Sequence, residues 1–266
     1  MSHKDRNPQR VDGTLEYSPP TNDRSFDEFQ IPAELPFPKN RRFCGREDLI
    51  DRIHEIFHPE DAGADVASYT SSSTAKLVAL HGLGGVGKTQ IALEYAHRHE
   101  RSYSAIIWVD ARDRIVLESS GVQIVQRLVR HYITESPSNP DYIRLASELG
   151  IPGGIDTSGT IQQAVLNSES VWRVVKQWLE RKGNVNWLLL VDNHDDVTVN
   201  ISDYLPTSNW GKIIVTSRRP EIRSLGHSLS VTEMEKDVGL ALLTKEMRDD
   251  ENFSAAGMHD HRRYTF

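Results

Sequence analysis

The sequence predicts an α/β fold: a three-layer sandwich in which a central, mostly parallel five-stranded sheet carries helices on both faces. Two observations lead to this prediction. Short apolar runs alternate with amphipathic helical stretches, which is typical of parallel strands that are buried on both sides. The first apolar run also leads through a glycine-rich turn directly into a helical stretch. No internal repeat indicates a solenoid.

The expected strands are short and mostly aliphatic, as buried strands are. They lie at residues 76–82, 105–113, 187–193, 211–219 and 227–231, and the last of them carries the weakest pattern. Because parallel strands end at one edge of their sheet, polar residues that follow these runs are expected to meet there.

The expected helices show apolar residues at helical spacing. They lie within 43–59, at 89–100, in the later part of 114–133, at 170–183 and at 231–247. In the fourth of these, one face carries Val171, Val174, Val175, Trp178 and Leu179, so this face should pack on the core. Residues 136–160 look loop-rich with one or two helical turns, and 61–75 read as a polar surface loop.

Composition gives three expected segments. Residues 1–40 hold half of the prolines and are expected to form a disordered or loosely docked tail, whose last part, 31–40, would lie extended across a folded domain. The folded domain should span 41–248, and 249–266 should be a disordered C-terminal tail. A single cysteine, Cys44, and a polar N-terminus without a signal peptide indicate a reducing, cytoplasmic location.

Charge and hydropathy exclude some classes of protein. Lys and Arg number 31 against 38 Asp and Glu, a net charge of −7, which argues against a dedicated nucleic-acid binder. The longest strongly apolar run, 187–191, is far shorter than the roughly 20 residues that a membrane span requires. We therefore expect neither a nucleic-acid partner nor a membrane partner.

The turn after the first expected strand reads GLGGVGKT at 82–89 and matches G-x-x-x-x-G-K-[ST] in full, the P-loop or Walker A pattern. Glycines let the backbone wrap tightly with its N–H groups pointing inward, and the helix that follows turns its positive end toward a phosphate. Lys88 would hold the β and γ phosphates, and Thr89 would offer its hydroxyl to Mg²⁺.

A P-loop also needs an acid near the metal, at the end of a neighbouring parallel strand. Asp192 is the best candidate, because four aliphatic residues precede it at 188–191. The next residue, Asn193, cannot act as a general base because an amide takes no proton from water. Asp195 and Asp196 either cap a turn or lie on the surface, which we favour, or reach the site and take part in chemistry.

The fourth expected strand ends in Thr216, Ser217, Arg218 and Arg219. An arginine beside a P-loop would stabilise charge on a terminal phosphate. Arg218 is the first choice for this sensor and Arg219 the second. The residues alone leave a surface pair before Pro220 as an equal alternative.

Together these segments resemble the NB-ARC family of STAND P-loop NTPases, and most closely its fungal NOD-like receptor type, which is often linked to tetratricopeptide repeats. The segments that carry the resemblance are FCGRE, HGLGGVGKTQIALEYA, IIWVDA, WLLLVDNHDD and GKIIVTSRR, in the family's order, between about residues 36 and 247. The resemblance implies that Gly45-Arg46 lies on the adenine side of the pocket and that Arg218 is the nucleotide sensor. The expected nucleotide-binding residues are Arg46, Gly82, Gly84, Gly85, Val86, Gly87, Lys88, Thr89 and Gln90, with Thr89 and Asp192 at the metal and Lys88, Asp192 and Arg218 as catalytic residues.

The chain also departs from the family pattern. The family continues into a helical domain with a Gly-x-Pro segment and then a winged-helix domain, but no Gly-x-Pro follows Val231 and the sequence stops at Phe266. Met258-His259-Asp260 spells the winged-helix triplet, yet it lies in a short polar tail, so we interpret it as a coincidence. We expect a chain truncated after its nucleotide-binding domain.

The resemblance predicts an ATP- or ADP-binding, Mg²⁺-dependent switch or assembly module in signal transduction, with slow ATP hydrolysis because residue 193 is no base. It would work with other protein chains that carry repeat or effector domains, and a homo-oligomer is an open alternative. The rival interpretation is a truncated, non-catalytic interaction module that binds nucleotide weakly or not at all.

Overall fold

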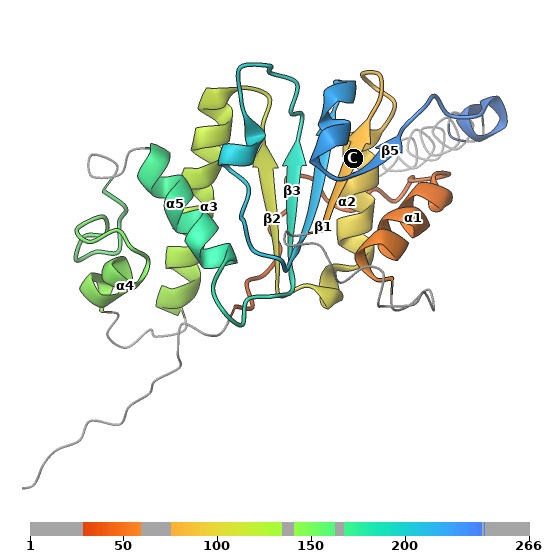
Figure 1. The fold of residues 1–266 in the computed structure, drawn as a ribbon. Coiled ribbons are helices and arrows are strands. Elements are labelled where there is room, and N and C mark those ends of the chain that lie inside the picture. The colour runs from red at the N-terminus through yellow and green to blue at the C-terminus, as the bar shows by residue number, and fades with distance from the viewer. Residues whose placement is uncertain (1–28, 60–75, 135–140, 163–167, 241, 243–266) are drawn as a thin grey trace, which may run out of the picture.

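The computed structural model describes residues 29–59, 76–134, 141–162, 168–240 and 242 (Figure 1). The α-helices are α1 (Glu47–Phe57), α2 (Lys88–Arg98), α3 (Arg114–Thr134), α4 (Tyr142–Glu148) and α5 (Ser168–Leu179). The strands are β1 (Lys76–His81), β2 (Ala105–Asp110), β3 (Trp187–Asp192), β4 (Lys212–Ser217) and β5 (His227–Ser230). Short 3₁₀ helices lie at η2 (Glu100–Ser102), η3 (Ile201–Asp203) and η4 (Pro220–Leu225).

The five strands form one sheet in the order β2-β3-β4-β1-β5, and each pairing is parallel. The predicted five-stranded α/β sheet is therefore confirmed, including its weak last strand. β4 lies between β3 and β1, so the strand that ends in Asp192 is not the direct neighbour of the strand before the P-loop. The expectation that Asp192 would end a neighbouring strand is corrected in this respect.

The strands β1 to β4 send alternate side chains into two different cores, as the pleat requires, whereas β5 is mostly exposed and only its Leu229 packs against a core. In β1, Leu77 and Ala79 pack under α3 and α5, whereas Val78 and Leu80 pack under α1 and α2. The predicted apolar face of α5 is buried: Val171, Val174, Val175, Trp178 and Leu179 are each at most 1% exposed. Helices thus cover both faces of the sheet and make the three layers (Figure 1).

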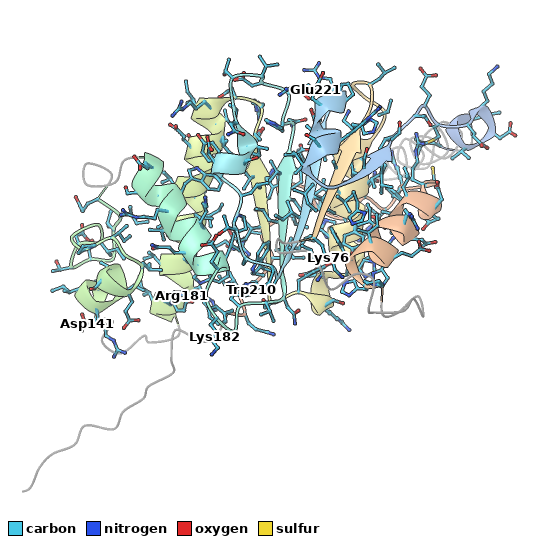
Figure 2. The ribbon with its side chains drawn as sticks, viewed as in Figure 1. Lys76, Asp141, Arg181, Lys182, Trp210 and Glu221 are labelled. Carbon is cyan, nitrogen blue, oxygen red and sulfur yellow. The ribbon has the colours of Figure 1, made fainter. Side chains whose placement is uncertain are left out.

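The carboxyl ends of the strands meet at one edge of the sheet. Glu221 of η4 lies at this end, whereas Lys76 and Trp210, which come before or at the start of strands, lie at the opposite end (Figure 2). Every polar strand end that the sequence singled out therefore falls at the same edge, together with the turn after β1.

α3 differs from expectation, since it is helical from Arg114 onward and not only in its later part. Asp113 explains the early start: its carboxylate accepts a hydrogen bond from the Val116 backbone N–H at 2.9 Å, and its carbonyl accepts one from Leu117. Such a side-chain cap satisfies an N–H group that the first helical turn leaves without a partner. In the loop-rich stretch, Asp141 caps the short α4 in the same way.

Residues 29–40, which we call the strap, were expected in the N-terminal tail. Phe29 and Ile31 are each 6% exposed, and the Phe29 ring packs edge-on against Trp178 with the centroids 6.0 Å apart. The Ile31 N–H donates to the Ser104 carbonyl at 2.8 Å, just before the edge strand β2. The folded part of the chain therefore begins at least twelve residues before the boundary expected at residue 41.

Other expectations fall on residues that the structure does not describe. In the helix expected at 231–247, residues 236–240 and 242 are helical, whereas 231–235 are not, so the helix begins later than expected; 241 and 243–247 lie outside the described residues. The surface loop at 61–75, residues 1–28 of the N-terminal tail and the whole C-terminal tail at 249–266 also lie outside them. Across the part of the chain that is described, no helix combines the length and apolar character needed to cross a bilayer.

Candidate functional site

The P-loop owes its shape to its glycines. Gly82 has φ +152°, and a Cβ there would lie 2.1 Å from the Val231 carbonyl oxygen, so no larger residue fits. Gly85 and Gly87 have φ of +79° and +97°, a region that only glycine enters at little cost. An added Cβ at either glycine would meet no atom within 4 Å, so both face open space. Gly87 then serves as the N-cap of α2.

Lys88 closes the loop from inside. Its ammonium group donates to the carbonyls of Gly82 at 2.9 Å and Leu83 at 2.7 Å, and the residue is only 9% exposed. Burial lowers the pKa of Lys88, with the nearby Arg218 acting in the same direction and Asp195 and Asp192 opposing it. A partly buried cation held by two carbonyls and no direct carboxylate is poised to meet an anion.

A cavity of about 590 Å³ opens above the loop, and we call it the P-loop cavity. Residues from four segments line it: the P-loop and α2, the end of β2, the turn after β3 and the end of β4. They are Gly84, Gly85, Gly87, Lys88, Thr89, Gln90, Arg112, Asn193, Asp195, Ser217 and Arg218. The residues predicted from the sequence that do not line it are Arg46, Gly82, Val86, Asp192, Asp196 and Arg219, the second choice for the sensor.

Asp192 lies just beneath the cavity and is tied to it by two hydroxyls. Thr89 donates to its Oδ1 at 2.7 Å and Thr216 at 2.6 Å. Asp192 is 3% exposed, and burial raises its pKa, although these two hydrogen bonds act to lower it. Thr216 lies on β4, the strand between β3 and β1, and Asp192 bonds both to this threonine and directly to Thr89 of the P-loop.

Asn193 and Asp195 follow Asp192 and enter the cavity. Asn193 has φ +60°, and its N–H donates to the Thr216 hydroxyl at 3.0 Å. Asp195 accepts hydrogen bonds from the Arg218 backbone N–H and guanidinium Nε, both at 2.6 Å, and from Ser217. Burial acts to raise the pKa of Asp195, but the bonds from Arg218 and Ser217 lower it below its ordinary value. The predicted sensor arginine is thus paired with an acid of the same cavity.

Asp196 points elsewhere. Its carboxylate accepts from the Thr198 N–H at 2.8 Å and from the Thr198 hydroxyl at 2.7 Å, which closes a local turn. These bonds lower its pKa. This geometry matches the capping role that the sequence favoured for it, while Asp195 takes a place beside the P-loop.

Arg46 and Gln90 lie at the side of the site. Arg46 has φ +65°, opens α1, and donates to the carbonyl of Thr232, which follows the Val231 that packs against Gly82. Gln90 lines the cavity, and its side-chain oxygen accepts a hydrogen bond from Asn40 of the strap at 3.0 Å. Arg46 therefore sits next to the start of the P-loop but outside the cavity lining.

Two residues of the site escaped the sequence analysis. Arg112 follows β2 and lines the cavity, where Asp110 holds its guanidinium through Nε at 2.8 Å. Asp110 stands opposite Asp192 in the β2–β3 register. The sequence contains one indication of these two residues. The second expected strand ends in the polar stretch D-A-R-D, and the third and fourth expected strands also end in polar residues.

The arrangement can bind a phosphate chain and a divalent cation. Loop N–H groups, the α2 N-terminus and Lys88 supply positive charge, and Arg218 and Arg112 also line the cavity. The described residues contain no group of three or more His, Cys, Asp or Glu that would hold a metal alone.

Three comparisons with known proteins show what this chain is similar to. The model of the NB-ARC domain matches residues 65–252. A nucleotide-binding leucine-rich repeat (NLR)-like protein from Hyaloscypha variabilis is 23% identical over 229 residues, which is 79% of this chain, and the chain spans only 19% of the length of that relative. Among solved structures, Cdc6p from Pyrobaculum aerophilum is similar over 79% of this chain and 51% of its own, with 11% identity and a TM-score of 0.43.

The family match covers well over half of the chain and includes the whole P-loop and the strand ends that form the cavity. The chain belongs to the NB-ARC domain family, a nucleotide-binding module with the P-loop NTPase fold.

Proposed function

We propose that this domain binds ADP and ATP together with Mg²⁺ in the P-loop cavity, acts as a nucleotide-dependent switch, and hydrolyses ATP slowly. The observation that carries the proposal is the grouping of Lys88, the Thr89–Asp192 pair and the Asp195–Arg218 pair around one cavity. The family membership supports nucleotide binding in general. The choice of adenine nucleotides follows from the resemblance of the Gly45-Arg46 segment.

The residues present fit a phosphate chain. Gly85 and Gly87 leave open the space that a Cβ would fill, so backbone N–H groups can approach a ligand closely. Lys88 would exchange its bonds to the Gly82 and Leu83 carbonyls for bonds to β and γ phosphates. Its lowered pKa reflects burial, and a bound anion would raise that pKa again.

Thr89 and Asp192 would hold the magnesium ion, directly or through water. Their hydroxyl and carboxylate are already 2.7 Å apart, and Thr216 keeps the carboxylate oriented from the other side. The metal would supply neutralisation of phosphate charge. Because burial raises the pKa of Asp192, a cation at this position also stabilises the ionised form of that carboxylate.

Slow hydrolysis follows from the lack of a strong base. Asn193 has no proton-accepting chemistry. Asp195 is ionised, but three hydrogen bonds from Arg218 and Ser217 occupy its oxygens and its pKa is lowered. A carboxylate of low pKa is a weak general base near neutral pH. Asp195 instead holds Arg218 in place. A terminal phosphate would compete with Asp195 for the guanidinium, and Arg218 would then bind that phosphate.

The switch role extends the proposal to partners and location. The relative from Hyaloscypha variabilis is named as a nucleotide-binding leucine-rich repeat-like protein, and this chain covers 19% of it. By analogy, the domain would report nucleotide state to repeat or effector segments on the same or another chain, in the cytoplasm and as part of signal transduction. A homo-oligomer is one form that such an assembly would take.

A titration with fluorescent ADP and ATP, with and without Mg²⁺, tests the proposal. Wild-type protein should bind both nucleotides, and Lys88→Ala should lose most of that affinity while keeping its thermal unfolding profile. Equal, weak signals for the two proteins would reject the switch and favour the non-catalytic interaction module. A high multiple-turnover ATPase rate would reject slow hydrolysis and indicate an ordinary ATPase.

A further inference from the structure

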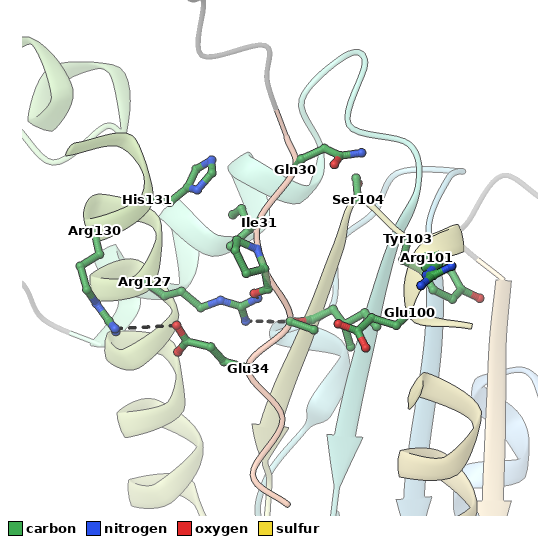
Figure 3. Close-up of a pocket in the computed structure, with 13 residues that line it drawn as sticks. Gln30, Ile31, Glu34, Glu100, Arg101, Tyr103, Ser104, Arg127, Arg130 and His131 are labelled. Atoms are coloured by element: carbon green, nitrogen blue, oxygen red, sulfur yellow. Dashed lines mark hydrogen bonds and ion pairs between the residues drawn. The ribbon is translucent and has the colours of Figure 1, made fainter. Parts of the chain in front are cut away.

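A second cavity, of about 940 Å³, lies near the start of β2, away from the P-loop (Figure 3). The strap, η2, the residues that lead into β2 and the second half of α3 enclose it, and we call it the strap cavity. Its lining residues are Gln30, Ile31, Pro32, Ala33, Glu34, Glu100, Arg101, Tyr103, Ser104, Ile106, Arg127, Arg130 and His131. Neither the P-loop nor a residue of the P-loop cavity contributes to it.

Arg127 is the buried cation of this cavity, with 8% of its surface exposed. It donates through Nη1 to the Ile106 carbonyl at 3.0 Å and through Nη2 to the Pro32 carbonyl of the strap. These bonds use two of its five N–H donors. Its Nε is buried without an acceptor, and burial lowers the pKa of Arg127.

The charge of Arg127 lacks a direct counter-ion. Among the described residues, no carboxylate forms an ion pair with it, and Glu34, whose charge still acts on it at longer range, pairs with Arg130 at 3.7 Å. Neutral carbonyls do not offset the desolvation of a guanidinium as a carboxylate or phosphate does. An anion that enters the cavity would therefore gain more binding free energy from Arg127 than it would from an arginine on an ordinary basic surface.

Two further arginines stand on different sides of the strap. Arg130 comes from α3, next to His131, and Arg101 comes from η2 on the other side (Figure 3). Against them stand Glu34 and Glu100. The chain as a whole carries −7, so this concentration of three arginines does not follow from its composition. Arg101 and Arg130 lie on different sides of the strap, so a ligand that contacts both arginines would present an anionic group to each.

We propose that the strap cavity binds a small molecule that carries at least two phosphate groups, with Arg127 at its floor and Arg101 and Arg130 at its rim. Arginine forks match phosphate oxygens in pairs, which favours phosphate chemistry at a site made of arginines. The volume exceeds that of the P-loop cavity, so a diphosphate fits within it. The site is independent of the proposed nucleotide switch.

Inorganic pyrophosphate is the probe for this site, used on Lys88→Ala protein so that the P-loop contributes as little as the chain allows. Side-chain ¹H–¹⁵N spectra of arginine Nε–Hε groups report on Arg127, whose signal is assigned by its loss in Arg127→Lys. The Arg127 signal should shift saturably with pyrophosphate at constant ionic strength. No saturable shift of that signal would overturn the proposal.

A rim variant, Arg101→Gln with Arg130→Gln, should weaken pyrophosphate binding at least tenfold, and both positions are exposed so that the fold should persist. Arg52→Gln with Arg144→Gln removes the same charge from exposed positions on α1 and α4 and should leave affinity unchanged. Equal weakening by the two double variants would show only a general charge effect and reject the site. Orthophosphate that binds as tightly as pyrophosphate would reject the need for two phosphate groups.

Discussion

The P-loop cavity and the strap cavity both concentrate positive charge, but they are built in opposite ways. Local backbone forms the first: three glycines, the start of α2 and the lysine that begins it. Long-range packing forms the second, since Arg127 meets the strap across 95 positions of the sequence. Acids accompany the cations of the first cavity, whereas Arg127 has carbonyls as its direct partners. The first cavity takes its shape from one local loop, whereas the second depends on the docking of the N-terminal strap.

The largest effect is expected where the strap enters the core. Phe29→Ala removes a buried ring that packs against Trp178 and should lower the free energy of unfolding by about 3 kcal/mol. Phe37→Ala, at a residue that is 54% exposed, is the matched control and should change it by less than about 0.5 kcal/mol. Urea unfolding measures both. Equal effects of the two variants would mean that the strap is not anchored at Phe29.

The next effect belongs to the P-loop and should leave the fold intact. Lys88→Ala should weaken ADP binding about 100-fold, or about 2.7 kcal/mol, because it removes the buried charge nearest the phosphates. The free energy of unfolding should stay the same or rise, since a desolvated ammonium is gone. Isothermal titration and urea unfolding give the two numbers. A loss of stability as large as that of Phe29→Ala would erase the distinction between the two cavities.

Asp192→Asn should act only through the metal. With Mg²⁺ present, ATP affinity should fall about tenfold, because an amide is a poor ligand for a hard cation and carries no charge. Without Mg²⁺ the variant should bind ADP as the wild type does. Burial raises the pKa of Asp192, so the charged carboxylate lowers stability near neutral pH and the neutral amide should not destabilise the apo protein. An equal loss of affinity with and without the metal would rule out this role.

A smaller effect is expected at the Asp195–Arg218 pair. Asp195→Asn removes the internal anion and frees the guanidinium, so ATP should bind about threefold more tightly relative to ADP. The ratio of ATP to ADP affinity within one variant removes any effect on the binding of the α and β phosphates, which both nucleotides carry. Asp196→Asn, on the turn outside the cavity, is the control and should leave that ratio unchanged. A lower ATP preference in Asp195→Asn would indicate that Asp195 takes part in chemistry instead.

The smallest effect concerns pH and a histidine that lines neither cavity. His99 stacks against His54 at 4.5 Å and contacts Tyr95, between the ends of α1 and α2. Its pKa is lowered first by burial and then by the charges of His54, His58 and Arg98, which Asp51 opposes. A lowered histidine pKa gives stability that is present above the usual value of about 6.5 and is lost as the pH falls through it. His99→Gln should flatten this fall in unfolding experiments between pH 7.5 and 5.5, and an unchanged slope would contradict the assignment.

The sequence by itself determined whatever depends on neighbouring residues. The apolar runs predicted the five strands, because burial on both faces requires uninterrupted aliphatic side chains. The motif GLGGVGKT predicted the loop, since glycine conformations and a helix start are local properties. Asp192 and Arg218 could be predicted as candidates because each lies at the carboxyl end of an apolar strand. Their roles at nucleotide and metal remain predictions.

Tertiary structure alone decided which distant groups meet. It placed β4 between β3 and β1, so that Asp192 bonds both to Thr216 of β4 and to Thr89 of the P-loop. It turned Asp195 toward Arg218 and Asp196 away from it. It also docked the strap and buried Arg127 beneath it. None of these follows from periodicity, because strand order and side-chain partners depend on packing between segments far apart in the sequence. Such packing places Arg127 beneath the backbone of the strap, whereas Lys88 lies in the P-loop cavity.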